Sequence, residues 1–165
     1  MVYRSLGILF SGNGFTLAFA EFHENAGKWN VETGATESYP AGPVNPLISG
    51  FIEKHNLQYR IAMITLHTEV SDTIFNGASV AAATKLPVIT DLPAMDIELG
   101  GNGEFYSFAA QKLNIEKDLP GSIAKATCIG LMGILRWREE YNFLSSQTGA
   151  SRSTIGGALW TGQEA

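Results

Sequence analysis

Two aspartates and a glycine cluster share one short stretch of the sequence, and their types and spacing could do chemistry. Asp91 stands two residues after a short apolar segment at residues 86–89, and Asp96 stands five residues further on. The glycine cluster begins four residues after Asp96 and consists of Gly100, Gly101, Asn102 and Gly103. A carboxylate at the end of a strand can accept a proton, and glycine lets the backbone approach a ligand closely. The stretch is typical of sites that bind sugars or phosphates.

Each of these residues also has a purely structural interpretation. Asp96 either contacts a ligand or orders its own loop by accepting hydrogen bonds from backbone amides. Asp91 either positions a water or a metal ion, or forms the turn that ends the strand, which is the interpretation we favour. The glycines Gly100 and Gly101 either approach a sugar or preserve a tight turn. With Asn102, they are our candidates for substrate contacts.

A second candidate site lies in the loop between two apolar runs near the start of the chain. The runs cover residues 6–10 and 15–22, and the loop between them is Ser11-Gly12-Asn13-Gly14. Asn-Gly between apolar runs is a strong hairpin signal. The amides of Ser11, Gly12 and Asn13 either hold a phosphate or form a plain turn.

Histidines add one further candidate. His67 follows an apolar strand predicted at residues 61–66 and is either a sugar contact or a hydrogen-bonded strand end. His23 and His55 are expected at the surface or at helix ends. No pair of histidines has the spacing of metal ligands, so we expect no metal site.

The elements that position these residues follow from the hydrophobic periodicity. We predict strands at 6–10, 15–22, 28–37, 61–66 and 87–90, and helices at 45–56, 76–84 and 120–146. Residues 91–119 are expected to be mainly loop, with a strand or short turn near 105–109, and residues 155–160 are a candidate for a last short strand. Gly130 and Gly133 cost helix propensity and are expected to allow close packing. Arg136, Arg138, Glu139 and Glu140 are expected to form a solvated face of the last helix.

This order of elements is that of the ribonuclease-H-like unit. Three antiparallel strands followed by alternating helices and strands predict a single α/β domain over residues 1–165, with a five-stranded mixed sheet and helices on both faces. At 165 residues and 17.8 kDa the chain is long enough to bury a core of its own.

Charge and composition narrow the choice of partners. The net charge is −5 and the isoelectric point is near 5.1, with no basic run, so we expect no nucleic-acid partner. The longest apolar run, residues 126–135, is about half of a bilayer crossing, so we expect no membrane partner. The first ten residues lack the features of a signal peptide, and the single cysteine, Cys128, fits a reducing compartment. We therefore expect a cytoplasmic protein.

Several segments resemble the bacterial anhydro-N-acetylmuramic acid kinases, which belong to the actin and sugar-kinase superfamily. Residues 7–14, 77–91 and 96–103 are similar to three motifs of the family's N-terminal lobe, which residues 1–113 match as a whole. Residues 121–165 resemble the family's C-terminal helix and the turn that follows it. The resemblance implies that Asp96 is the catalytic base, that Asp91 and His67 lie at the substrate, and that ATP and Mg²⁺ are the cofactors.

Two departures from that family shape the functional expectation. The chain is about half as long, so the second lobe and most of the adenosine site are missing, and the first hairpin lacks the family's aspartate. The loss of that aspartate favours a plain turn at Ser11-Gly12-Asn13. We therefore expect no cofactor and a catalytically silent relative that keeps a weak amino-sugar site, with a place in amino-sugar metabolism and peptidoglycan recycling following from the resemblance alone.

Two alternatives remain open at this stage. The face left by the missing lobe could make the chain a homodimeric interaction module, with Phe105, Tyr106, Phe108 and Trp160 lining that face. Alternatively, two copies could together rebuild an active anhydro-sugar kinase, which we consider the weaker hypothesis because no copy contains the nucleotide-binding sequences.

Overall fold

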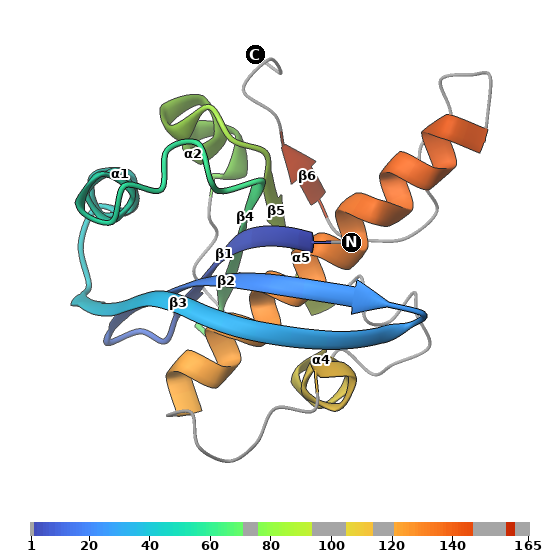
Figure 1. The fold of residues 1–165 in the computed structure, drawn as a ribbon. Coiled ribbons are helices and arrows are strands. Elements are labelled where there is room, and N and C mark those ends of the chain that lie inside the picture. The colour runs from blue at the N-terminus through green and yellow to red at the C-terminus, as the bar shows by residue number, and fades with distance from the viewer. Residues whose placement is uncertain (1, 71–75, 94–104, 114–120, 147–157, 161–165) are drawn as a thin grey trace.

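Six strands form one mixed sheet in the order β3-β2-β1-β4-β5-β6, with helices on both faces (Figure 1). The computed structural model describes residues 2–70, 76–93, 105–113, 121–146 and 158–160. The strands are β1 Val2–Phe10, β2 Gly14–Asn25, β3 Lys28–Pro40, β4 Met63–Thr68, β5 Val88–Thr90 and β6 Ala158–Trp160. The helices are α1 Val44–Lys54, α2 Gly77–Thr84, α4 Phe105–Leu113 and α5 Gly121–Ser146.

The first three strands form an antiparallel meander closed by two tight turns. Ala26 and Gly27, between β2 and β3, both have positive φ, as a type I′ turn requires. In the first hairpin Phe10 pairs with Phe15, and the Ser11 amide donates to the Gly14 carbonyl, so the tip is Gly12-Asn13. Gly12 has φ +94°, which suits the first central position of a type II′ turn, so the tip lies one residue before the Asn-Gly pair.

The other half of the sheet is mainly parallel. β1 pairs in parallel with β4, and β4 with β5, while the short β6 adds to β5 in antiparallel orientation. Helices α1 and α2 precede β4 and β5 in the chain, as crossover connections between parallel strands do. The carboxyl ends of β1, β4 and β5 therefore meet at one edge, which we call the carboxyl edge.

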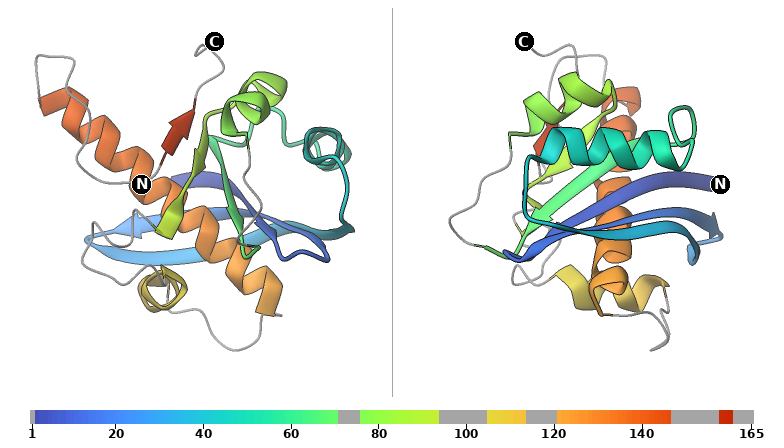
Figure 2. Two further views of the ribbon diagram at one scale, coloured as in Figure 1. Left: turned by 180° about the vertical axis from the view of Figure 1, so that it is seen from behind. Right: turned by 90° about the vertical axis from the view of Figure 1, so that its left-hand side faces the viewer.

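Helices cover both faces of the sheet (Figure 2), and each face has its own buried core. Helices α1 and α2 cover one face, where Leu6, Leu17 and Phe51 are buried. Helices α4 and α5 cover the other face, where Phe22, Phe105 and residues of α5 are buried. Strands of the meander bury residues toward both cores, which explains their nearly continuous apolar runs.

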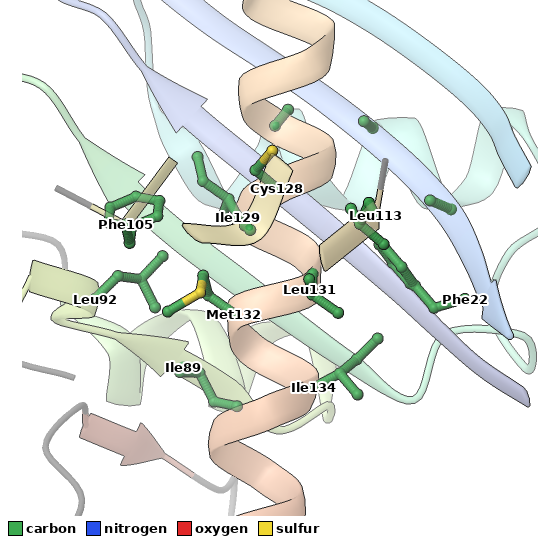
Figure 3. Packing of buried hydrophobic residues seen from close by; sticks show 14 of the residues in the cluster. Phe22, Ile89, Leu92, Phe105, Leu113, Cys128, Ile129, Leu131, Met132 and Ile134 are labelled. Atoms are coloured by element: carbon green, nitrogen blue, oxygen red, sulfur yellow. The ribbon is translucent and has the colours of Figure 1, made fainter. Parts of the chain in front are cut away.

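Helix α5 packs against the sheet and also against α4, and this double contact accounts for its apolar sequence. Figure 3 shows buried side chains of this helix, among them Cys128 and Met132, in one cluster with Ile89, Leu92 and Phe105. A Cβ atom added at Gly133 would lie 1.7 Å from Thr65 Oγ1, and one added at Gly7 of β1 would lie 1.9 Å from the Ala126 carbonyl oxygen. Glycine at these positions lets the helix contact the strands directly.

The structure confirms the predicted fold class, an α/β domain of the ribonuclease-H-like type. The five predicted strands are present, and β6 falls within residues 155–160, the candidate for a last strand. Two local expectations are wrong. Residues 105–113 form helix α4 rather than a strand or short turn. Arg136, expected on a solvated helix face, is only 4% exposed.

No helix among the described residues is long and apolar enough to cross a membrane.

Candidate functional site at the carboxyl edge of the sheet

The carboxyl edge brings together predicted site residues from three strands. The loop Ser11-Gly12-Asn13 follows β1 directly, and His67 lies in β4 opposite Leu9 of β1. The β4–β5 register pairs Ile64 with Val88, an offset of 24 residues that also separates His67 from Asp91. Asp91, just beyond β5, therefore comes to the level of His67.

The chain makes a tight turn after β4 and holds the first hairpin against it. The Thr68 hydroxyl donates to the Val70 carbonyl and accepts from the Val70 amide. The Glu69 amide donates to the Phe10 carbonyl at 2.9 Å, which ties this turn to the end of β1. Val70 Cγ2 would lie 3.0 Å from a Cβ on Gly12. The hairpin loop and the segment after β4 thus form one surface.

His67 lies half-buried among aromatic rings at this edge. Its ring meets Phe105 of α4 edge-on at 4.7 Å between centroids and Tyr106 at 5.9 Å. Burial lowers the pKa of His67 below its ordinary value of 6.5, a shift that the Glu69 carboxylate opposes and Lys125 supports. The imidazole is therefore mainly neutral at pH 7, with one nitrogen able to donate and the other able to accept.

Lys125 places a positive charge beside this histidine. It lies near the start of α5, where its ammonium donates to Glu69 Oε2 at 2.8 Å and lies 5.3 Å from the centre of the Tyr106 ring. The Lys125 side chain is 43% exposed and that of Glu69 33% exposed. The amides of the first turn of a helix carry partial positive charge, so this end of α5 adds to the attraction for anions.

These groups can bind an anion beside a flat ring. Lys125 supplies charge, His67 a neutral hydrogen-bonding group, and Tyr106 an aromatic surface that is partly buried. Three side chains close enough to hold a metal ion together, Glu21, His23 and Glu32, come from β2 and β3, whereas in the part of the chain that the structure describes none of the residues at the carboxyl edge forms such a group.

The structure describes some of the predicted site residues and not others. Ser11, Gly12, Asn13, His67 and Asp91 all belong to the carboxyl edge. Asp91 is exposed and has φ +63°, a left-handed conformation that aspartate adopts more readily than most residues and that fits the turn-forming interpretation. Four predicted residues lie outside the described part of the chain, namely Asp96, Gly100, Gly101 and Asn102.

Lys125 and Glu69 were missed at the level of the sequence. They are separated by 56 positions, so only the packing of α5 against the sheet shows that they meet. One signal for Lys125 was present, because a single lysine among the alanines and isoleucines that begin the apolar part of the helix is out of place in a covered face. Phe105, expected on an uncovered face, is 1% exposed and forms part of the core.

Comparisons with known proteins find similar structures but no similar sequence. No family model matches the chain, and no curated protein matches it in sequence. A structure of RuvC from Thermus thermophilus matches with a TM-score of 0.58 and 15% identity, over 84% of this chain and 96% of that chain. A second structure, T. thermophilus RuvC in complex with Holliday junction substrate, matches with a TM-score of 0.49 and 14% identity, over 82% and 95% of the two chains. At 15% identity, the likeness to the first of these structures shows a shared fold and no more.

The assignment to the anhydro-N-acetylmuramic acid kinases is therefore wrong. A solved structure that shares the fold of this chain is that of RuvC, and no family model or curated protein matches the sequence. The matched segments, residues 7–14, 77–91 and 96–103, are rich in glycine and small residues, and short segments of such composition recur in proteins of unrelated function. The silent sugar-kinase relative, its amino-sugar ligand and its role in peptidoglycan recycling are withdrawn with that assignment.

The expectations about partners need the same correction. The homodimer, and the active kinase assembled from two copies, were both inferred from a missing kinase lobe. Without the kinase assignment there is no missing lobe, so both hypotheses lose their basis. The exclusion of nucleic acid is withdrawn: it rested on net charge alone, and RuvC, whose fold this chain shares, is itself a protein solved with a Holliday junction substrate. A net charge of −5 averages over the whole surface, whereas a phosphate responds mainly to charges within about 10 Å.

Proposed function

We propose that this chain binds nucleic acid at the carboxyl edge of its sheet, with Lys125 against the phosphodiester backbone. The single observation that carries the proposal is the position of Lys125, at the start of α5 and beside His67 and Tyr106. The shared fold with RuvC supports a nucleic acid over other anions.

The chemistry of the edge suits a phosphate next to a base. The ammonium of Lys125 and the first-turn amides of α5 attract the phosphate, and a neutral His67 donates a hydrogen bond without adding charge. The Tyr106 ring offers an aromatic surface on which a base can stack. In the free protein Glu69 Oε2 lies 2.8 Å from Lys125 Nζ and pairs with it. A bound phosphate replaces this carboxylate as the partner of the ammonium.

The proposal is one of binding and does not include cleavage. Nucleases that use two metal ions need several carboxylates converging on one point. Of the described residues, Glu69 and Asp91 bring carboxylates to this edge, and Glu69 is already paired with Lys125. These residues do not fit such a metal centre, so we derive no metal-dependent step and no cofactor. Asp91, Asp96 and the glycines Gly100 and Gly101 remain candidate ligand contacts.

The variant Lys125→Gln tests the proposal. Removing one phosphate contact is expected to weaken binding to all sequences about equally, and to reduce the dependence of log K on log salt by about one. Glu69→Gln is expected to strengthen binding, because it removes the negative charge that competes with phosphate. Fluorescence anisotropy with labelled four-way junction, duplex and single-stranded DNA at low salt measures both effects, with and without Mg²⁺.

Lys54→Gln is the matched control. Lys54 is also a lysine paired with a glutamate, Glu37, but it lies on α1. Its substitution is therefore expected to leave the binding of nucleic acid unchanged. The proposal fails if the wild-type chain binds none of these nucleic acids at low salt. It also fails if Lys125→Gln binds as the wild type does, or no worse than Lys54→Gln.

The proposed compartment is the cytoplasm. Cys128, the one cysteine of the sequence, is 3% exposed, and burial raises the pKa of its thiol to about 11. A thiol of this kind packs as an apolar group and does not depend on an oxidising compartment.

A further inference from the structure

Three side chains that can ligate a metal ion converge on the sheet face far from the carboxyl edge. Glu21 and His23 are two residues apart on β2 and therefore point to the same face, and Glu32 of β3 lies directly opposite Glu21. One ligand atom from each of the three lies within 4.8 Å of the other two. His23 pairs with Val2, eight residues along β1 from Phe10, so the cluster lies roughly 25 Å from the carboxyl edge.

The spacing of the first two ligand atoms matches that of ligands on one zinc ion. Glu21 Oε1 lies 3.0 Å from His23 Nε2. Two ligands at the usual zinc distances and a tetrahedral angle are about 3.3 Å apart. A metal ion can thus replace the proton that these two atoms share, with only a small movement of either side chain.

A neighbouring side chain orients one ligand of the cluster. Arg4 of β1 donates to Glu21 Oε2 at 2.9 Å, which fixes the carboxylate while leaving Oε1 toward His23. Such partners orient metal ligands in known sites. Glu21 and Glu32 are like charges placed directly opposite each other, an arrangement that destabilises a sheet and that Arg4 offsets in part. Glu32 is exposed, so solvent reaches the site.

We propose that Glu21, His23 and Glu32 form a binding site for a divalent transition-metal ion of the zinc type, with a fourth position open to water. One imidazole and two carboxylates suit zinc better than Mg²⁺, which prefers oxygen ligands alone. The site lies on paired strands, which hold the three side chains in a fixed register. This proposal does not depend on the binding of nucleic acid.

The chain contains its own matched control for this site. His55 Nε2 lies 3.0 Å from Glu37 Oε2, the same spacing as in the proposed site. Glu37, however, already accepts hydrogen bonds from Lys54 and Tyr39, and this pair has no third ligand among the described residues. A histidine and a glutamate in contact are thus present at both places, but a three-ligand cluster only at one.

Isothermal titration of the full-length, tag-free protein with Zn²⁺ tests the proposal. The wild type is expected to bind one equivalent, and His23→Gln and Glu32→Gln are each expected to weaken binding about tenfold or more. His55→Gln is expected to bind as the wild type does. Circular dichroism checks that the variants are folded, which the exposure of Glu32 favours.

Three results would overturn the proposal. The first is that the wild type takes up no zinc at millimolar concentration. The second is that either His23→Gln or Glu32→Gln binds zinc as tightly as the wild type. The third is that His55→Gln loses as much affinity as the other two variants.

Discussion

At the scale of single residues, glycines set how closely α5 lies against the sheet. Gly133 faces Thr65 of β4, and Gly7 of β1 faces the backbone of Ala126. The sequence indicates that Gly133 has a packing role, because glycine in the middle of a long helix otherwise costs stability. It does not indicate the partner, which depends on where the helix crosses the strands.

Gly133→Ala is predicted to destabilise the protein by about 1–3 kcal/mol. The added methyl group would lie 1.7 Å from Thr65 Oγ1 and 2.9 Å from its Cβ, so the helix must move away from β4. Urea denaturation followed by circular dichroism measures the change in free energy of unfolding.

Gly50→Ala provides the control for this prediction. Gly50 lies on the exposed side of α1, and no atom lies within 4 Å of an added Cβ. The substitution is predicted to stabilise the protein by about 0.5–1 kcal/mol, because alanine favours the helix. If both variants change stability in the same direction, close packing at Gly133 is not the cause.

The candidate site shows what can and cannot be found at this scale. Asp91, His67 and the loop after β1 were chosen as candidates because each ends an apolar run, and strand ends are recognisable in a sequence. Glu69 and Lys125 were missed because nothing in the sequence states that residue 69 meets residue 125. Arg136 was misassigned for the same reason, since its burial depends on what packs over α5.

At the scale of elements, one carboxylate fixes α1 to β3. Glu37 of β3 accepts hydrogen bonds from Lys54 at the end of α1, from His55 just after it, and from Tyr39. These bonds, Lys54 first and then Tyr39 and His55, lower the pKa of Glu37 to about 2. Burial and the hydrogen bond to Glu37 raise the pKa of Tyr39 to about 12, so that its hydroxyl keeps its proton.

This contact predicts an acid-dependent loss of stability. Glu37 has a pKa of about 2 in the folded protein and an ordinary value of 4.5, so its contribution is complete above pH 4.5 and is lost as the pH falls toward 2. Glu37→Gln is therefore predicted to be less stable than the wild type at pH 7, and the difference is predicted to shrink below pH 4. Urea denaturation at several pH values measures it, and a difference independent of pH would contradict the prediction.

Helix α4 shows where the sequence held more information than was used. Phe105, Ala109 and Leu113 recur every fourth residue and are all buried, as the apolar side of a helix requires. The aromatic residues near its start favoured a strand or turn, and the short length of the element concealed the period. Long elements with many repeats, such as α5, were predicted correctly.

At the scale of the whole molecule, the order of strands and helices was enough to predict the fold class. Three antiparallel strands followed by alternating helices and strands leave few arrangements that bury both faces of the sheet. Function could not be derived in the same way, because one fold carries many activities and short turn motifs recur among them. The result is a sheet with two separate candidate sites, one at the carboxyl edge and one near the other end of β1.

The most direct test of the account is to map bound nucleic acid on the folded protein. In ¹H–¹⁵N correlation spectra, titration with a short DNA duplex and with a four-way junction is predicted to shift amides of residues 11–13, 67–70 and 121–125. Amides of the β2–β3 turn, residues 25–28, are predicted to stay in place. The absence of shifts, or shifts centred on that turn, would contradict the claim that the carboxyl edge binds nucleic acid.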